Sequence, residues 1–149
     1  MYLENTQTTD PVLTTDSVNN NVSDSRYGLY LIGPMNGLTV DSTRFSFGNN
    51  KAAPLQIAAN DLIVKDLTLQ GANDGNGIGI MLSLNSSSQT LENLTINNVT
   101  ATNFGLGLGA FGTTLRGFSF EGNTFKNNTS FNFYSNTDMG DLVLGGNER

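Results

Sequence analysis

The segment from Gly71 to Gly77, Gly-Ala-Asn-Asp-Gly-Asn-Gly, has the residue types that come nearest to a metal site. Asn73, Asp74 and Asn76 carry side-chain oxygens at close spacing, which is what Ca²⁺ requires of its ligands. A single carboxylate provides little negative charge for binding a divalent cation, however, and Asn, Asp and Gly are ordinary turn residues. We therefore predict a surface turn without a metal, and Ca²⁺ is the one cofactor that this segment could accept.

Carboxylate catalysis would need two acidic side chains at a defined separation. Asp74 has no such partner nearby. Asp66 and Asp141 share one position of the repeat described below, but Asn93 and Gly117 take that position in the repeats between them. The chain has no Cys and no His, which removes thiolate and imidazole chemistry and the usual zinc ligands. We predict that the protein is not an enzyme and has no catalytic residue.

A binding role would depend on hydroxyl groups and aromatic rings. Tyr30 and Tyr134 could stack on a sugar ring, and a row of outward hydroxyls would form a flat, weakly polar face. The row consists of Ser46, Thr68, Thr95 and Ser119. Ser and Thr are also ordinary exposed strand residues, so a plain surface is the alternative interpretation. Most of the remaining aromatic residues in the second half of the chain are expected to fill the core.

These residues must be positioned by a recurring triplet of apolar, small and apolar residues. Successive copies begin 22, 27, 24 and 24 residues apart, and a period in this range is typical of stacked supersecondary units. The copies, called the first ladder, are Phe45-Ser46-Phe47, Leu67-Thr68-Leu69, Leu94-Thr95-Ile96, Phe118-Ser119-Phe120 and Leu142-Val143-Leu144.

Two further series recur in the same order. The second ladder is Leu29-Tyr30-Leu31, Leu55-Gln56-Ile57, Ile78-Gly79-Ile80, Leu106-Gly107-Leu108 and Phe131-Asn132-Phe133, and the third is Val40, Val64, Leu91, Leu115 and Met139. Short alternation predicts strands, and the Gly, Asn and Asp residues between them tolerate positive φ. Three strand types in constant order predict an all-β chain that winds into a parallel β-helix. In this alignment Lys65, Glu92 and Arg116 would stack with alternating charge.

Repeats such as Leu91-Glu92-Asn93-Leu94-Thr95-Ile96-Asn97-Asn98 resemble those of the right-handed parallel β-helix superfamily, often called pectin-lyase-like. The resemblance extends from about Tyr27 to the C-terminus. It implies a right-handed, single-stranded solenoid (about five coils of 22–27 residues) with apolar columns inside and stacked Asn residues at the turns. It also implies a turn position at Gly71, Asn98, Gly122 and Gly146. The paired acidic residues of polysaccharide-cleaving members would lie near Ile78–Leu82, where this sequence has none.

Composition and charge limit the partners and the location. Residues 1–26 are polar and predict an extended N-terminal arm, followed by the β-helix over residues 27–149. The net charge is −6 and the seven Lys and Arg residues are scattered, which argues against nucleic-acid binding. No apolar run approaches the ~20 residues of a membrane span, so membrane insertion is not expected. The predicted location is extracellular, on a cell surface or on a virion.

The last predicted strand, Leu142-Val143-Leu144, lies in an incomplete coil without a cap. Uncapped solenoid ends expose strand edges that invite pairing with another chain. We therefore expect these three residues to serve assembly and the partner to be a second copy, end to end in a filament or side by side in a trimer. The predicted function is a structural or adhesive module, such as a filament subunit, a phage tail fibre or spike, or an adhesin stalk. The alternatives are a module that binds cell-surface glycans and a fragment of a polysaccharide lyase or hydrolase.

Overall fold

The computed structural model describes residues 2–4, 20–21, 27–41, 44–46, 53–83, 90–112, 114–136 and 143–145. These residues form strands and turns and contain no helix. The strands are β1 Tyr2–Glu4, β2 Asn20–Asn21, β3 Tyr27–Asp41, β4 Arg44–Ser46, β5 Ala53–Lys65, β6 Thr68–Gln70, β7 Ile78–Ser83, β8 Thr90–Glu92, β9 Leu94–Asn97, β10 Thr100–Thr102, β11 Leu106–Phe111, β12 Thr114–Arg116, β13 Ser119–Glu121, β14 Thr124–Lys126, β15 Phe131–Ser135 and β16 Val143–Gly145.

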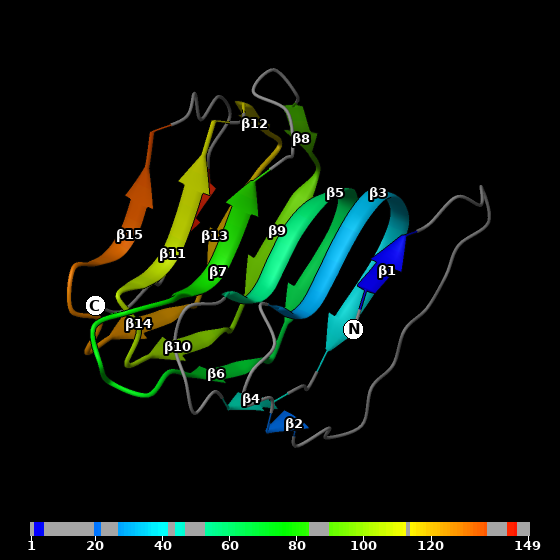
Figure 1. The fold of residues 1–149 in the computed structure, drawn as a ribbon. Coiled ribbons are helices and arrows are strands. Elements are labelled where there is room, and N and C mark those ends of the chain that lie inside the picture. The colour runs from blue at the N-terminus through cyan, green and yellow to red at the C-terminus, as the bar shows by residue number, and fades with distance from the viewer. Residues whose placement is uncertain are drawn as a thin grey trace.

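Parallel pairing stacks these strands into three walls (Figure 1). Wall 1 contains β1, the first halves of β3 and β5, and β7, β11 and β15. Wall 2 contains the second halves of β3 and β5, and β9, β13 and β16. Wall 3 contains β2, β4, β6, β10 and β14, while β8 and β12 pair at the corner before wall 2. β1 and β2 lie at one end of the stack, and β14 and β15 at the other.

The predicted all-β parallel solenoid is therefore confirmed. The number of coils differs slightly from the five expected. Within the predicted N-terminal arm, the structure describes β1 and β2 alone, and these extend walls 1 and 3 by parallel pairing with β3 and β4.

The corners between walls are turned by residues with positive φ. Asp61, Asn93 and Gly117 stack before wall 2 with φ of 54°, 55° and 58°, and Asp66, Asn98 and Gly122 stack after it with φ of 55°, 51° and 62°. Asp, Asn and Gly are the residues that reach this conformation at least cost. The predicted turn position is right for Asn98 and Gly122. Asp66 occupies it in place of Gly71, which follows wall 3, and Gly146 lies outside the described residues.

Inward side chains form apolar columns along the solenoid. The columns are Leu29, Leu55, Ile80 and Leu108 in wall 1, Val64, Ile96 and Phe120 in wall 2, and Leu69, Ala101 and Phe125 in wall 3. Burial of each large apolar side chain stabilises the fold by about 1.5–3 kcal/mol before the entropy of ordering is subtracted. Towards β14 and β15 the core becomes aromatic, because the Phe120 ring lies 5.8 Å from Phe118, 5.3 Å from Phe125 and 5.6 Å from Phe133.

The first ladder is not one wall, which corrects the predicted alignment. Its last three copies do stack in wall 2, where Thr95 pairs with Ser119 and Ser119 with Val143. Leu69 instead pairs with Phe45 and Ala101 in wall 3. The wall 2 strand of that turn is Leu62–Lys65, the second half of β5. The pattern of apolar, small and apolar residues does not identify this strand, because β5 continues through the corner at Asp61 without a break in strand structure.

The third ladder divides in the same way. Val40 pairs with Val64 and Val64 with Ile96 in wall 2, whereas Leu91 pairs with Leu115 in the corner strands. The predicted charge stack is therefore right for Glu92 and Arg116 and wrong for Lys65, which pairs with Asp41 and Asn97. The shared position of Asp66 and Asn93 is wrong as well, because Asn93 stacks on Asp61.

Candidate functional site

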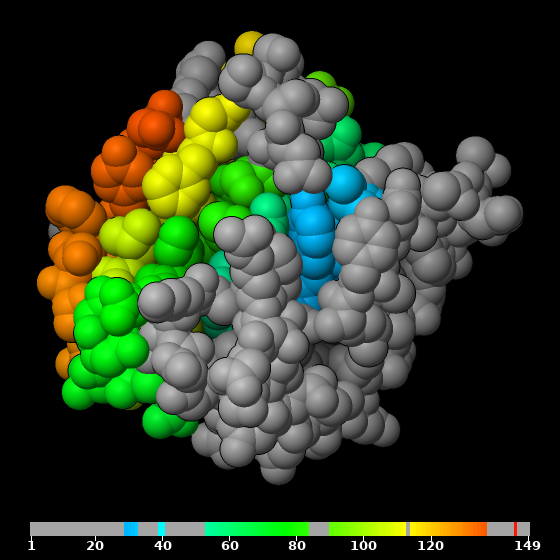
Figure 2. All heavy atoms as spheres, viewed as in Figure 1, coloured from blue at the N-terminus to red at the C-terminus, as the bar shows by residue number. Residues whose placement is uncertain are grey.

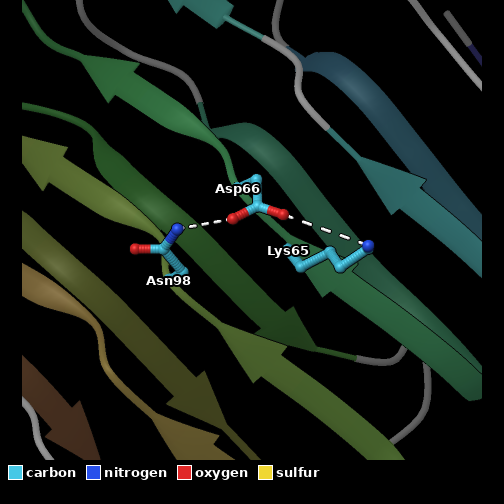
Figure 3. Close-up of polar contacts among 3 residues, drawn as sticks. All are labelled: Lys65, Asp66 and Asn98. Atoms are coloured by element: carbon cyan, nitrogen blue, oxygen red, sulfur yellow. Dashed lines mark hydrogen bonds and ion pairs between the residues drawn. The ribbon is translucent and has the colours of Figure 1, made fainter.

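The aspartates at the corners of wall 2 are bound to asparagines of the next turn. Asn93 Nδ2 donates to Asp61 Oδ1 over 2.8 Å, and Asn98 Nδ2 donates to Asp66 Oδ1. Figure 3 shows Asp66 between Asn98 and Lys65, whose Nζ lies 4.0 Å from Asp66 Oδ2. Lys65 and Asp66 are each 42% exposed, so the ion pair itself adds little stability. The hydrogen bonds link successive turns, which is a structural use of these carboxylates.

The segment Gly71–Gly77 forms an exposed turn beside the next coil. Asp74 Oδ1 accepts a hydrogen bond from the backbone N of Asn76 over 2.9 Å, the geometry of an Asx turn. Asn73 has φ of 63° and its backbone N donates to Asn103 O over 3.0 Å. Within the described part of the chain, no three acidic side chains lie close enough to hold a metal ion together.

The predicted hydroxyl row is distributed over two walls. Thr95 and Ser119 are neighbours on wall 2, where Ile63 precedes them. Thr68 lies on wall 3 and pairs with Arg44 and Thr100, while Ser46 pairs with Gln70 in the adjacent column. The four predicted residues therefore do not form one face.

Wall 3 carries a threonine row that sequence reasoning missed. Thr68, Thr100 and Thr124 pair in succession, each half-buried beside an inward apolar residue. The order Thr, apolar, polar in Thr68-Leu69-Gln70, Thr100-Ala101-Thr102 and Thr124-Phe125-Lys126 is the signal that could have revealed this row.

On wall 1, both predicted tyrosines lie in one column along the solenoid axis. Successive pairings place Tyr30 beside Gln56, Gln56 beside Met81, Met81 beside Gly109, and Gly109 beside Tyr134. Four strand steps of about 4.8 Å separate the two tyrosines by roughly 19 Å. Their rings therefore cannot share one sugar unit, and Gln56, which lies beside Tyr30 in this column, is buried.

Tyr134 belongs to an aromatic patch formed with Phe111 and Phe131. The Tyr134 ring centroid lies 5.6 Å from that of Phe111 and 5.8 Å from that of Phe131, and the ring pairs are tilted by 35° and 39°. Gly109 makes room for Phe111, since a Cβ at position 109 would lie 2.5 Å from Phe111 Cε2. Phe131 is 55% exposed. The patch is thus a packed set of rings with one ring facing solvent.

A change in side-chain alternation brings Phe131 to the surface. A Cβ at Gly107 would meet Phe125 and Asn128 on the inside, yet the next residue, Leu108, is also fully buried. Leu106 is therefore on the outer side, and Phe131 pairs with it in β15. The expectation of a core role holds for most of the late phenylalanines and is wrong for Phe131.

The strands that carry and adjoin the aromatic patch contain no charged residue. None of β7, β11 and β15 contains a charged residue. Figure 2 shows the atoms of these strands, in green, yellow and orange, side by side on one face of the molecule. At its edge, Gln56 Nε2 donates to Ser83 Oγ over 3.0 Å. The aromatic patch therefore suits a neutral partner.

The predicted assembly residues lie at the end of wall 2. Val143 and Leu144 in β16 pair with Ser119 and Phe120, and Leu142 lies outside the described residues. No protein-family model, curated protein or solved structure matches this chain. In the part of the chain that the structure describes, no helix is long and apolar enough to cross a membrane.

Proposed function

We propose that the protein is a non-catalytic structural or adhesive module that associates with copies of itself. The observation that carries the proposal is the outer strand of wall 1, β15, which pairs with β11 alone among the described strands, contains no charged residue and exposes Phe131. An open strand edge beside exposed apolar surface favours association with another chain.

The acidic side chains support a non-catalytic role. Asp61 and Asp66 accept hydrogen bonds from asparagines of the next turn, and Asp74 accepts one from its own loop. We extend the proposal to a setting outside the cell, in a filament, an adhesin stalk or a phage tail fibre. Kinship with the pectin-lyase-like superfamily is likewise proposed, on the fold and the repeats alone.

Light scattering of the full chain at micromolar concentration tests self-association. We expect a mass several times that of one chain, and elongated particles or fibres by electron microscopy. A Phe131→Ser variant should show a lower average mass at the same concentration, because it removes exposed apolar surface. A monomer of wild-type protein without fibres would overturn the proposal.

Glycan binding is the second candidate function, favoured by the ring geometry of the aromatic patch. Sugar rings offer C–H faces that stack on aromatic side chains, and an uncharged platform suits neutral hexoses. In a titration against neutral oligosaccharides, Phe131→Ala should weaken binding by roughly 2- to 12-fold, because one stacking contact contributes roughly 0.5–1.5 kcal/mol. Thr95→Ala, on wall 2, is the matched control and should bind as wild type does. Equal affinities of the two variants would exclude the aromatic patch as a sugar site.

A further inference from the structure

The loop between β6 and β7 contains the dipeptide Asn76-Gly77, in which an amide side chain is followed by a residue without a side chain. Figure 1 shows this loop, in green, at the edge of the solenoid, and Figure 2 shows its atoms on the surface. Asn76 is exposed and Gly77 is half-buried. Gly77 has φ of 75°, which a residue with a side chain rarely adopts, so the fold itself favours glycine after this asparagine.

The groups of this dipeptide that can react with each other are weakly held. Among the described residues, Gly77 N donates no hydrogen bond. Asn76 Nδ2 lies 3.5 Å from Asp74 O, which is longer than the usual range for such a bond. The backbone N of Asn76 donates to Asp74 Oδ1 over 2.9 Å, which orders the turn without engaging the amide of Asn76. A reaction between Gly77 N and this amide therefore breaks no strong contact within the described part of the chain.

We propose that Asn76 is a site of spontaneous deamidation. Base removes the proton of Gly77 N, and this nitrogen attacks Cγ of Asn76. A C–N bond forms, the bond from Cγ to Nδ2 breaks, and Nδ2 takes up a proton and leaves as ammonia, so that the two residues share a cyclic imide. Water then opens the ring. Cleavage between Gly77 N and Cγ leaves aspartate, whereas cleavage between Gly77 N and the backbone carbonyl carbon leaves isoaspartate, in which the main chain passes through Cγ.

Other asparagines of the chain provide the comparison. The sequence has one further Asn-Gly dipeptide, Asn36-Gly37, which is part of strand β3, where extended backbone opposes ring closure. Asn127 resembles Asn76 in exposure and lies in a turn with φ of 57°. It is followed by Asn128, whose side chain restricts the backbone and is held by hydrogen bonds to the preceding turn. Asn127 is therefore the matched internal reference for an exposed asparagine without a following glycine.

Deamidation acts on the contact between this loop and the next coil. Asn76 O accepts a hydrogen bond from Gly105 N over 2.7 Å, and Gly77 O accepts one from Leu106 N over 3.1 Å. The approach is close, because a Cβ at Gly105 would lie 2.8 Å from Gly75 O. Isoaspartate turns the carbonyl of residue 76 into a side-chain carboxylate and adds a methylene group to the main chain before Gly77. The two bonds can then no longer form at their present spacing, which loosens the start of β11 from the loop.

Ageing of the full chain in mildly alkaline buffer, followed by peptide mapping with mass spectrometry, tests the site. Fragment spectra assign each change from an amide to a carboxyl group to one residue. We expect Asn76 to react faster than Asn127 by about tenfold or more, because glycine leaves the attacking nitrogen accessible. An Asn76→Gln variant should stay unmodified at this position, since its longer side chain does not form the same ring. Equal rates at Asn76 and Asn127 would overturn the proposal.

Thermal unfolding tests the effect on the coil. The modified chain has one additional carboxylate and is separated from fresh protein by anion exchange. We expect the isoaspartate form to melt about 2–4 °C lower than fresh protein, the shift produced by the loss of one hydrogen bond. Asn76→Asp adds the same charge to an unaltered backbone and should melt as wild type does, because position 76 is exposed.

Two results would contradict the loosening of β11. One is an isoaspartate form that melts at the wild-type temperature. The other is an equal decrease for Asn76→Asp, which would assign the effect to charge and not to the lengthened main chain. All samples are compared at one protein concentration, so the outcome does not depend on whether copies of the chain associate.

Discussion

Replacing Gly107 with alanine is expected to destabilise the solenoid by about 3 kcal/mol or more, because overpacking against backbone cannot be relieved by a rotamer change. A Cβ at this position in β11 would lie 2.5 Å from Asn132 O, 2.6 Å from Phe125 Cδ1 and 2.8 Å from Asn128 Nδ2. To make room, β15 would have to move away from β11. Thermal unfolding should show the melting temperature lowered by roughly 6–12 °C.

The added methyl group would also disrupt the hydrogen bonds of Asn128. Its Oδ1 accepts from Phe104 N over 3.0 Å, and its Nδ2 donates to Ala101 O over 3.1 Å and to Asn132 Oδ1 over 3.0 Å. A methyl group at position 107 displaces the amide that makes these bonds. The aromatic patch would also lose its alignment, because Phe131 and Tyr134 are carried by β15.

Gly112→Ala is the matched control. Gly112 has φ of 61°, but nothing lies within 4 Å of a Cβ built there. Its replacement should cost only about 1–2 kcal/mol, the penalty of an L-residue in the left-handed region. Equal losses of stability for the two variants would show that backbone conformation, and not space between strands, decides the tolerance of these glycines.

The sequence was sufficient to predict the parallel solenoid but not how residues of one turn pair with those of the next. Alternation and spacing were sufficient for the parallel solenoid, because burying one side of each strand constrains every turn in the same way. They were insufficient for the register between turns. A shift by two residues keeps the same side chains inward, and this is what happened in wall 1, where Leu55 pairs with Ile80 and not with Ile78.

The candidate site was harder to predict for a related reason. Tyr134 was named from the sequence as a residue that could stack on a sugar ring, but its neighbours Phe111 and Phe131 were not. Phe131 reaches the surface through a local change of alternation between Gly107 and Leu108. Two successive inward residues in a strand cannot be recognised from the sequence when one of them is glycine, because glycine occurs at both inward and outward positions of this chain. The corner at Asp61 could not be predicted either, because its φ of 54° turns the chain in the middle of the continuous strand β5. Local backbone geometry of this kind is set by packing between turns.

Asn123→Asp is expected to make stability depend on pH in a way that wild-type protein does not. Asn123 is fully buried, its Oδ1 accepts from Val99 N over 2.9 Å, and its Nδ2 donates to Ile96 O over 2.9 Å. A protonated aspartic acid can reproduce both bonds. An ionised one cannot donate to Ile96 O and places a buried charge beside that carbonyl, which costs about 3–5 kcal/mol when uncompensated.

The sign of the pH dependence follows from the pKa of the introduced carboxyl. Burial raises its folded-state pKa above the unfolded value of about 3.9. Below that unfolded pKa the group is protonated in both states, and the variant should be nearly as stable as wild type. As the pH rises further, the unfolded state alone loses the proton, so relative stability falls by about 1.4 kcal/mol per pH unit until the folded-state pKa is reached.

Urea unfolding of the variant and of wild type from acidic to neutral pH, at one protein concentration, measures this difference. Asn123→Ala controls for the lost hydrogen bonds and should be less stable than wild type by a pH-independent amount of about 1–3 kcal/mol. Asn127→Asp controls for the added charge, since Asn127 is exposed, and should differ little from wild type. A constant deficit for Asn123→Asp across this range would mean that the buried amide does not need its donor to Ile96. The bond from Val99 N to Asn123 Oδ1 would then be the more important of the two for the link between this corner and the preceding turn.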